Sequence, residues 1–353
     1  MMRGLYFLWG LIFITGCIDT IEVDLPQRPA GRLVVAGVVE RGPDDYRFLV
    51  DVVRTQDLED EKPAVRESAD IRILNQGVET LSLDNGQSLV FAIDSFHDVF
   101  GGTADAAVFN IEIKTTLGGV FTSLDQKVLA PPQGSTPAVR YEERSELNNV
   151  GNVVENGYVK LLMNSSLLNA TSERVSLRWD VSGVFRFPER PWTDNPFIFV
   201  NTCYVKVGSK GNQINIVNSA EVNNNEVFEF EVSENEADYR FASGYYYTIL
   251  QKAISNETAS YWQELQKGVN RAGTIFDSPA GQIRSNITQT DGSPEDFLGY
   301  FYTAGVDTLR YLATWEETGK QFHLCARATV SDACCDCLLL VNSSYDKPHY
   351  WVD

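Results

Sequence analysis

The sequence has few of the residues, and none of the common motifs, on which enzyme active sites depend. It contains only three histidines, at positions 97, 323 and 349. It has no His-Glu-x-x-His zinc motif, no Gly-x-Ser-x-Gly nucleophile turn, no glycine–lysine phosphate loop and no dinucleotide fingerprint. The 48 acidic residues leave a glycosidase-like carboxylate pair open, but a solvated acidic surface is the simpler interpretation. We therefore expect a protein that is not an enzyme.

Positive charge is also scarce. The chain has 29 Lys and Arg residues against 48 Asp and Glu residues, which gives a formal net charge of −19 at pH 7. This balance argues against binding to nucleic acid and against lying flat on anionic lipid. The hydrophobic content of 43% is nevertheless ample for packed cores. The composition thus indicates a folded, acidic body.

Residues 1–16 have the features of a secretory signal. Arg3 provides one positive charge, an apolar run covers 5–14, and small residues precede Cys17. Ile14-Thr15-Gly16-Cys17 is similar to the bacterial lipobox, in which the cysteine receives diacylglycerol and becomes the N-terminus. An ordinary signal that happens to end in cysteine is the alternative. We expect diacylglycerol and N-acyl lipid on Cys17, which together anchor a protein far more firmly than one chain does.

The rest of the chain is typical of a mainly β protein with one helix. Residues 17–31 contain two prolines and scattered acids, so we expect a lipidated tether there. Short β-branched runs over 32–130 predict an Ig-like β-sandwich, and Asp84-Asn85-Gly86 predicts a hairpin. The proline-rich stretch 131–137 suggests a boundary. Residues 138–353 predict a second β-rich domain with a helix at about 256–269 and a Cys-rich C-terminus.

Five cysteines remain besides the one expected to carry lipid. They are Cys203, Cys325, Cys334, Cys335 and Cys337. An exported protein is exposed to oxidising conditions, so we favour disulfides over a zinc site with His323, whose neighbours lack Cys-x-x-Cys spacing. We expect at least one disulfide among the last four, and His323 as an ordinary strand residue. Because five is odd, at least one thiol must be free or paired between molecules.

Several segments, in a consistent order, resemble the DUF4249 family of Bacteroidota outer-membrane lipoproteins. They are the lipid cysteine, the acidic run ending at Leu25-Pro26, and residues 33–37, 260–265, 273–279, 285–287, 298–301, 335–337 and 347–351. The cysteine at position 334 is additional to this pattern and makes the disulfide pairing uncertain. The resemblance implies an accessory partner of a TonB-dependent, SusC-like receptor at the cell surface. It carries over no catalytic residue, metal or cofactor.

Two functions follow as hypotheses. The first is a surface-exposed outer-membrane lipoprotein that is a non-enzymatic partner of a β-barrel complex. The second is a stand-alone surface lipoprotein that binds glycan or peptide. The mixture of helix, Gly/Pro-rich loop and aromatic residues suggests a partner surface, or support for one, at Trp262, Ile275, Phe276, Tyr300 and Phe301. Burial of these side chains in the core is the alternative, and core packing is favoured for the 245–247 tyrosines.

Overall fold

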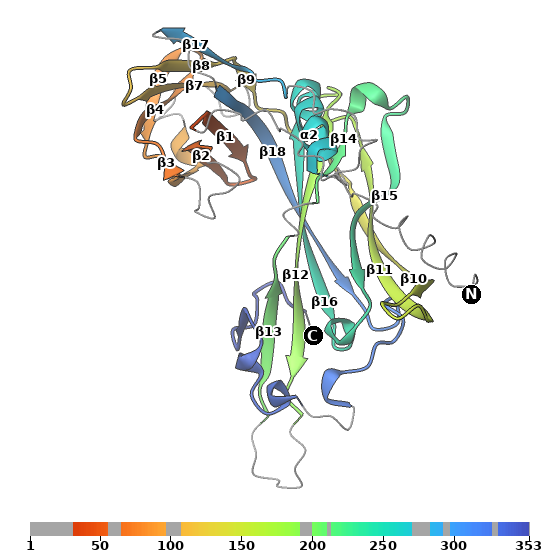
Figure 1. The fold of residues 1–353 in the computed structure, drawn as a ribbon. Helices are drawn as coiled ribbons and strands as arrows, with labels where there is room; N and C mark the ends of the chain where they lie inside the picture. The colour runs from red at the N-terminus through yellow and green to blue at the C-terminus, as the bar shows by residue number, and fades with distance from the viewer. Residues whose placement is uncertain are drawn as a thin grey trace, which may run out of the picture.

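The computed structural model describes residues 31–55, 65–96, 107–190, 200–209, 213–269, 283–291, 297–326 and 331–352. The signal, Cys17, most of the tether, and the predicted contact residues Ile275 and Phe276 lie outside these ranges. The expected mainly β fold is confirmed, and the strands form two lobes (Figure 1). Within the described ranges, no helix has the length and apolar character needed to span a bilayer.

The N-terminal lobe is a β-sandwich. One layer contains β1 (Leu33–Arg41), β2 (Asp45–Arg54), β3 (Val65–Arg66) and β6 (Ser88–Ala92). The other contains β4 (Ala69–Asn75), β5 (Val78–Leu83), β7 (Val108–Thr115), β8 (Val120–Ser123), β9 (Gln126–Lys127) and β17 (Ile287–Asp291). Alternate residues of β2, such as Phe48 and Val50, are fully buried against Ile111 and Phe109 of β7, so period-two patterning fixes the inward face.

One strand joins the two lobes. β18 (Phe297–Ala313) pairs in parallel with β1 along its first half and antiparallel with β16 (Tyr245–Ile254) along its second half. At about 3.3 Å per residue this strand is roughly 55 Å long, and Figure 1 shows it running from one lobe into the other. β17 and β18 therefore complete the N-terminal lobe from the far end of the sequence. The lobes are one continuous structure rather than two consecutive units.

The C-terminal lobe is a second pair of sheets. β13 (Thr202–Val207), β12 (Ser176–Pro188), β16 and β18 form the larger layer, with β14 (Asn215–Val217) and β19 (Ser343–Ser344) at its edge. β10 (Thr136–Leu147), β11 (Val153–Ser166) and β15 (Glu226–Glu236) face it. The core between them contains Trp179 and the ring of Tyr247, both almost fully buried. Tyr245 lies in the same core, and Tyr246 is buried in a separate cluster with Trp351, so packing of the 245–247 tyrosines is confirmed.

The turn predicted at Asp84-Asn85-Gly86 is present, but the prediction of a hairpin there is wrong. The strand after the turn, β6, pairs with β2 rather than with β5. The Asn85 amide bonds both backbone groups of Val52 at 2.8 and 2.7 Å, which directs the chain into the opposite sheet.

Where the chain passes between lobes, a Cβ on Gly305 would lie 2.0 Å from the Leu129 carbonyl oxygen, so only glycine permits this crossing.

The predicted helix is confirmed as α2 (Asn256–Val269). It begins where the Ser255 hydroxyl accepts a hydrogen bond from the Thr258 amide at 3.2 Å, as expected of a helix N-cap. The helix lies on the larger sheet, on the face away from β10, β11 and β15, close to the junction of the lobes (Figure 1). It therefore covers the part of β18 that changes partners.

Candidate partner-binding surface

The described aromatic residues predicted to form a partner surface pack inside the molecule instead: Tyr300 and Trp262 lie between α2 and the sheet, and Phe301 lies in the N-terminal core. Tyr300 is 6% exposed and stacks on Tyr261 of α2, with 4.2 Å between ring centroids. Phe301, on the other face of β18, is fully buried in the N-terminal core. Trp262 is half-buried under the Arg178 guanidinium, whose carbon lies 3.7 Å from the ring centroid. The assignment of Tyr300 and Phe301 to a contact surface is corrected, because period-two alternation directs both rings into packed layers.

A buried ion cluster lies beside α2 and connects both lobes. The Lys252 ammonium is 2.5 Å from Glu40 on β1 and 2.7 Å from Asp180 on β12. Asp180 also contacts Arg178 at 2.9 Å. Burial raises the pKa of the Asp180 carboxyl, but the two cations outweigh it and hold this pKa below its ordinary value. The cluster balances its charges internally, so we assign it to joining the lobes.

The C-terminal cysteines form disulfides, as expected. Cys203 of β13 is bonded to Cys337, and Cys325 is bonded to Cys334. Cys335 is a free, exposed thiol. The two bridges fix the irregular segment after β18, which contains the short 3₁₀ helices η5 (Leu324–Ala326), η6 (Asp332–Cys334) and η7 (Cys337–Leu339). Cys203–Cys337 therefore holds the segment to the larger sheet, and Cys325–Cys334 closes a loop within the segment.

His323 belongs to this clamped segment and not to a strand, which corrects the expectation for it. Its ring is 5% exposed and lies 4.7 Å from the ring of Phe187. The Nδ1 atom accepts a hydrogen bond from the Cys325 amide at 3.1 Å. Burial, with a smaller contribution from Arg190, lowers the pKa of His323 to about 4. The imidazole is therefore neutral at pH 7 and serves the packing around the disulfide.

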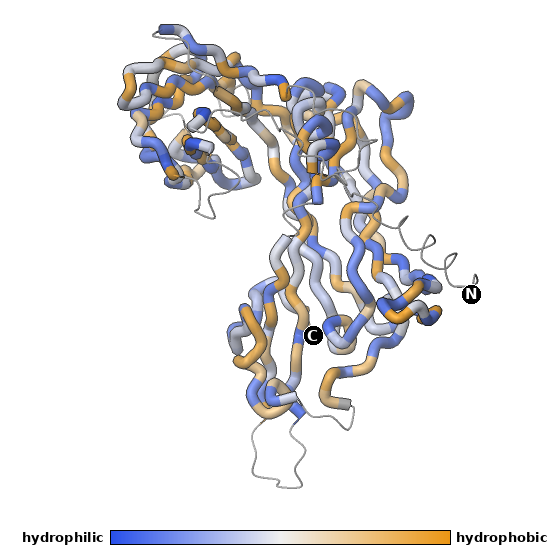
Figure 2. Tube along the Cα trace, viewed as in Figure 1, coloured by the Kyte–Doolittle hydropathy of each residue, from blue (hydrophilic) through white to orange (hydrophobic). Residues whose placement is uncertain are grey.

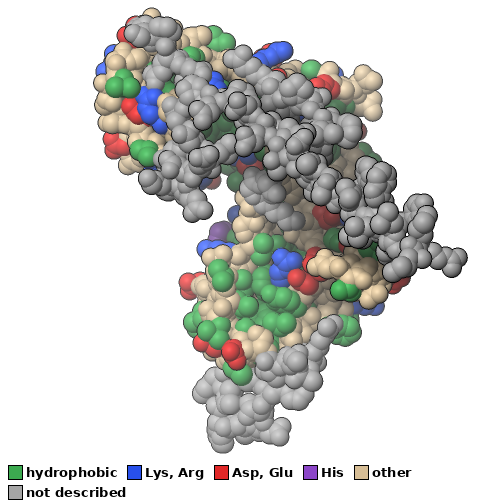
Figure 3. Space-filling view, in the orientation of Figure 1, with side chains coloured by type: hydrophobic (Ala, Val, Ile, Leu, Met, Phe, Trp, Pro, Cys, Tyr) green, Lys and Arg blue, Asp and Glu red, His purple; other side chains and the backbone are tan. Residues whose placement is uncertain are grey.

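Exposed apolar side chains gather on the turn that follows Cys337. Leu338, Leu339, Val341 and Tyr345 are 46%, 61%, 82% and 47% exposed, and we call them the C-terminal apolar turn. Hydrophobic side chains are visible over much of the C-terminal lobe in Figure 3. Sequence reasoning missed this surface. Its signal was the uninterrupted apolar run 338–341, which has no alternation of polar residues and of which Leu340 alone packs against the core.

The turn is held rigidly at both ends. On one side is the Cys203–Cys337 bridge, and the Cys337 amide also donates to Glu189 at 3.1 Å. Asp336 caps η7 by accepting from the Leu338 amide at 3.0 Å. On the other side β19 pairs with β13, which ties the chain down again. The apolar side chains are thus exposed although the backbone beneath them is fixed.

The family model for a domain of unknown function, DUF4249, matches residues 18–310. The chain belongs to the DUF4249 family. No curated protein and no solved structure matches it. The DUF4249 match includes the ion cluster and α2, and it ends within β18. The disulfide-bonded segment and the C-terminal apolar turn lie beyond the matched range, as do the resembling segments 335–337 and 347–351.

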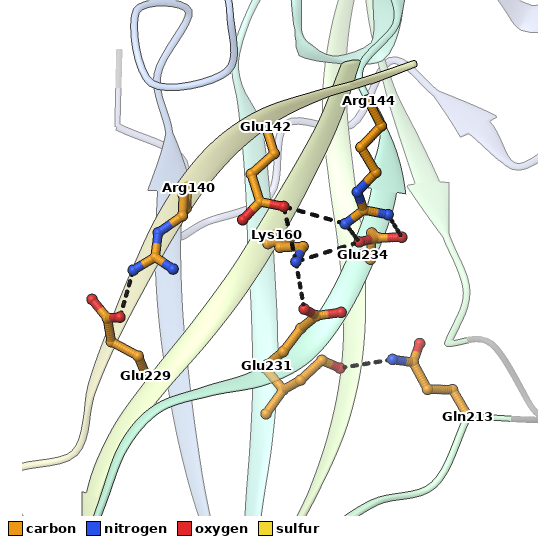
Figure 4. Close-up of polar contacts among 9 residues, drawn as sticks. Arg140, Glu142, Arg144, Lys160, Gln213, Glu229, Glu231 and Glu234 are labelled. Atoms are coloured by element: carbon orange, nitrogen blue, oxygen red, sulfur yellow. Dashed lines mark hydrogen bonds and ion pairs between the residues drawn. The ribbon is translucent and has the colours of Figure 1, made fainter. Parts of the chain in front are cut away.

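The DUF4249 chain also presents a charged face on β10, β11 and β15. Lys160 contacts Glu142 at 3.0 Å and Glu231 at 3.1 Å, and Arg144 contacts Glu234 at 2.5 Å (Figure 4). Lys160 donates hydrogen bonds to Glu142 and Glu231, and these bonds raise its pKa. Since these cations are already paired with glutamates, the face offers little to an anionic partner. It behaves as a solvated surface.

Proposed function

We propose that this protein is a lipid-anchored outer-membrane lipoprotein that acts by contact, as a non-enzymatic partner of a β-barrel complex of the TonB-dependent receptor class. Lipid on Cys17 supplies the attachment, with the body facing the cell exterior. The C-terminal apolar turn supplies the contact with the barrel complex. The observation that carries the proposal is this turn, in which exposed apolar side chains sit on a backbone fixed by a disulfide and a strand pair.

Rigidity is what distinguishes the turn from scattered surface hydrophobes. Contiguous exposed apolar residues mark interaction sites, whereas single ones are ordinary. Binding requires that the contacting chain be ordered, and this ordering costs free energy when the free surface is mobile. Here the disulfide and β19 have already fixed the backbone. Asp336 and Asp346 flank the apolar side chains, which gives the apolar centre and polar rim of a protein interface.

Co-purification tests this proposal. The double variant Leu339→Ser/Val341→Ser should lose the barrel protein that the unaltered chain brings down from detergent-solubilised membranes. The matched control is Val78→Ser/Leu117→Ser, which replaces residues that are 66% and 76% exposed on the N-terminal lobe. Both variants should keep the melting temperature of the unaltered protein, since no buried side chain changes. Full recovery of the barrel with Leu339→Ser/Val341→Ser would refute the contact assigned to the turn.

A stand-alone ligand binder is the second candidate, and one pocket favours it. The pocket has a volume of about 460 Å³ and opens where β13 and β14 separate along β12. Tyr245, Ser233 and Asn235 line it, and burial raises the pKa of Tyr245 to about 12, so its hydroxyl stays protonated. Calorimetry of the purified chain with oligosaccharides and short peptides separates the two functions. Binding that disappears with Tyr245→Phe, without any recovered barrel, would favour this alternative.

A further inference from the structure

A second apolar surface lies at the end of the hairpin formed by β10 and β11. Leu147, Val150 and Val153 are 72%, 78% and 69% exposed. Leu147 and Val153 are direct cross-strand partners, and Val150 lies in the turn between them, so the three form one cluster. Hydrophobic residues at the end of this hairpin are visible in Figure 2. We call residues 147–153 the hairpin tip.

The tip is preorganised. The Asn148 side-chain oxygen accepts hydrogen bonds from the amides of Val150 at 3.1 Å and Asn152 at 2.9 Å. The Asn148 amide donates to the Asn152 carbonyl at 2.9 Å, and Gly151 adopts a φ of 81° that closes the turn. The aliphatic side chains therefore remain exposed without any local collapse that would cover them.

We propose that the hairpin tip inserts into the surface of a lipid bilayer. The apolar side chains of the tip are all aliphatic, and the tip lacks the Trp, Tyr and Arg side chains that dominate protein-binding hot spots. Uncharged asparagines at 148, 149 and 152 surround the apolar cluster, which suits the level of lipid headgroups. This inference rests on the proposed lipid anchor, because that anchor keeps a bilayer near the body at all times.

Charged residues around the hairpin tip set how deeply it inserts and which class of lipid it prefers. Glu146 accepts hydrogen bonds from Asn156 at 3.0 Å and Tyr158 at 2.8 Å, and these bonds lower its pKa. Glu146 therefore stays ionised and stops insertion just behind Leu147. The glutamates of the charged face on the same sheet disfavour anionic lipid. The bilayer that fits the tip is zwitterionic or neutral at its surface.

The length of the tether limits how far the body can lie from its lipid anchor. About 14 residues separate Cys17 from Gly31, the first described residue, and a chain of this length spans at most roughly 50 Å. The lipid anchor and the hairpin tip are thus two attachments of one body. Together they would fix its orientation, which one flexible attachment cannot do.

Fluorescence of the intact lipidated protein in phosphatidylcholine vesicles tests the inference. In a Cys335→Ser background, Val150→Cys carries an environment-sensitive label, and Leu117→Cys on the β7–β8 turn is the matched control. Brominated lipid should quench the label at position 150 about twofold or more and leave position 117 unchanged. Equal quenching at both positions, or none at 150, would overturn the proposal.

A second measurement separates the tip from the anchor. The Cys17→Ala chain has no lipid, so its weak flotation with phosphatidylcholine vesicles reports the body alone. The variant Leu147→Ser/Val150→Ser/Val153→Ser should reduce this flotation about tenfold, since burial of three aliphatic side chains is lost. The mass of the Cys17 peptide reports lipidation independently. If the triple variant loses a barrel partner but keeps its flotation, the tip contacts protein and the proposal fails.

Discussion

The ammonium of Lys252 lies 2.5 Å from the carboxylate of Glu40, and this contact joins strands that are far apart in the sequence. Glu40 belongs to β1 of the N-terminal lobe, whereas Lys252 belongs to β16 of the C-terminal lobe, and β18 runs between them. The side chain of Lys252 is only 9% exposed. The relative placement of the two lobes therefore depends on a buried charge and on the shared strand.

Removal of that charge should be strongly destabilising. Lys252→Met leaves Glu40 without its cation and Asp180 with Arg178 alone, and breaking a buried pair in this way typically costs about 3–5 kcal/mol. Lys114→Met is the matched control, since Lys114 is 44% exposed beside Glu112 and its pair should contribute less than about 1 kcal/mol. Urea unfolding measures both values. A cost for Lys252→Met no larger than that of the control would contradict the role given to the cluster.

Acid should destabilise the protein through His323. Its folded pKa is lowered to about 4, from an ordinary value near 6.5, so the unfolded chain binds the extra proton first. Stability is therefore complete above about pH 6.5 and is lost progressively as the pH falls toward 4. His323→Phe keeps the aromatic contact with Phe187 and should flatten this part of the pH profile. His349→Phe, at an exposed position, is the control, and an unchanged slope in His323→Phe would refute the assignment.

The two disulfides should differ in their contribution to stability. Cys203–Cys337 spans 134 residues and Cys325–Cys334 spans 9. If a disulfide acts mainly by restricting the unfolded chain, removal costs about 5 kcal/mol for the long loop and about 3 kcal/mol for the short one. Thermal unfolding of Cys203→Ser/Cys337→Ser and Cys325→Ser/Cys334→Ser measures the two effects. A larger loss of stability on removal of Cys325–Cys334 would mean that local packing, and not chain entropy, determines how much each disulfide contributes.

Cys335 should be the reactive thiol of the native protein. It is exposed and unpaired, whereas the other cysteines of the described C-terminal segment are bonded. Maleimide should add once to the folded, lipidated chain, and Cys335→Ser should remove this addition. Intact mass spectrometry counts the adducts. Labelling that persists in Cys335→Ser would show that one of the two disulfides is open.

Sequence patterns were sufficient wherever neighbouring residues decide the structure. Short β-branched runs predicted strands such as β2 in the N-terminal lobe, and the helix predicted at about 256–269 is α2. They failed where a residue contacts a partner that is distant in the sequence. The Asn85-Gly86 turn is local, but the sheet into which it directs β6 depends on Val52. The long bridge joins residues 134 apart. Period-two alternation places Tyr300 and Phe301 on opposite faces of β18, but it could not say that both faces are covered by packed layers.

Photocross-linking in intact cells tests the central claim most directly, namely that the C-terminal apolar turn contacts a barrel complex. A photoreactive amino acid at position 341 should cross-link the lipidated protein to an outer-membrane β-barrel protein, because Val341 is 82% exposed on a rigid turn. The same amino acid at position 117, on an exposed turn of the other lobe, should not. Cross-linking at 117 but not at 341, or at neither position, would contradict the account.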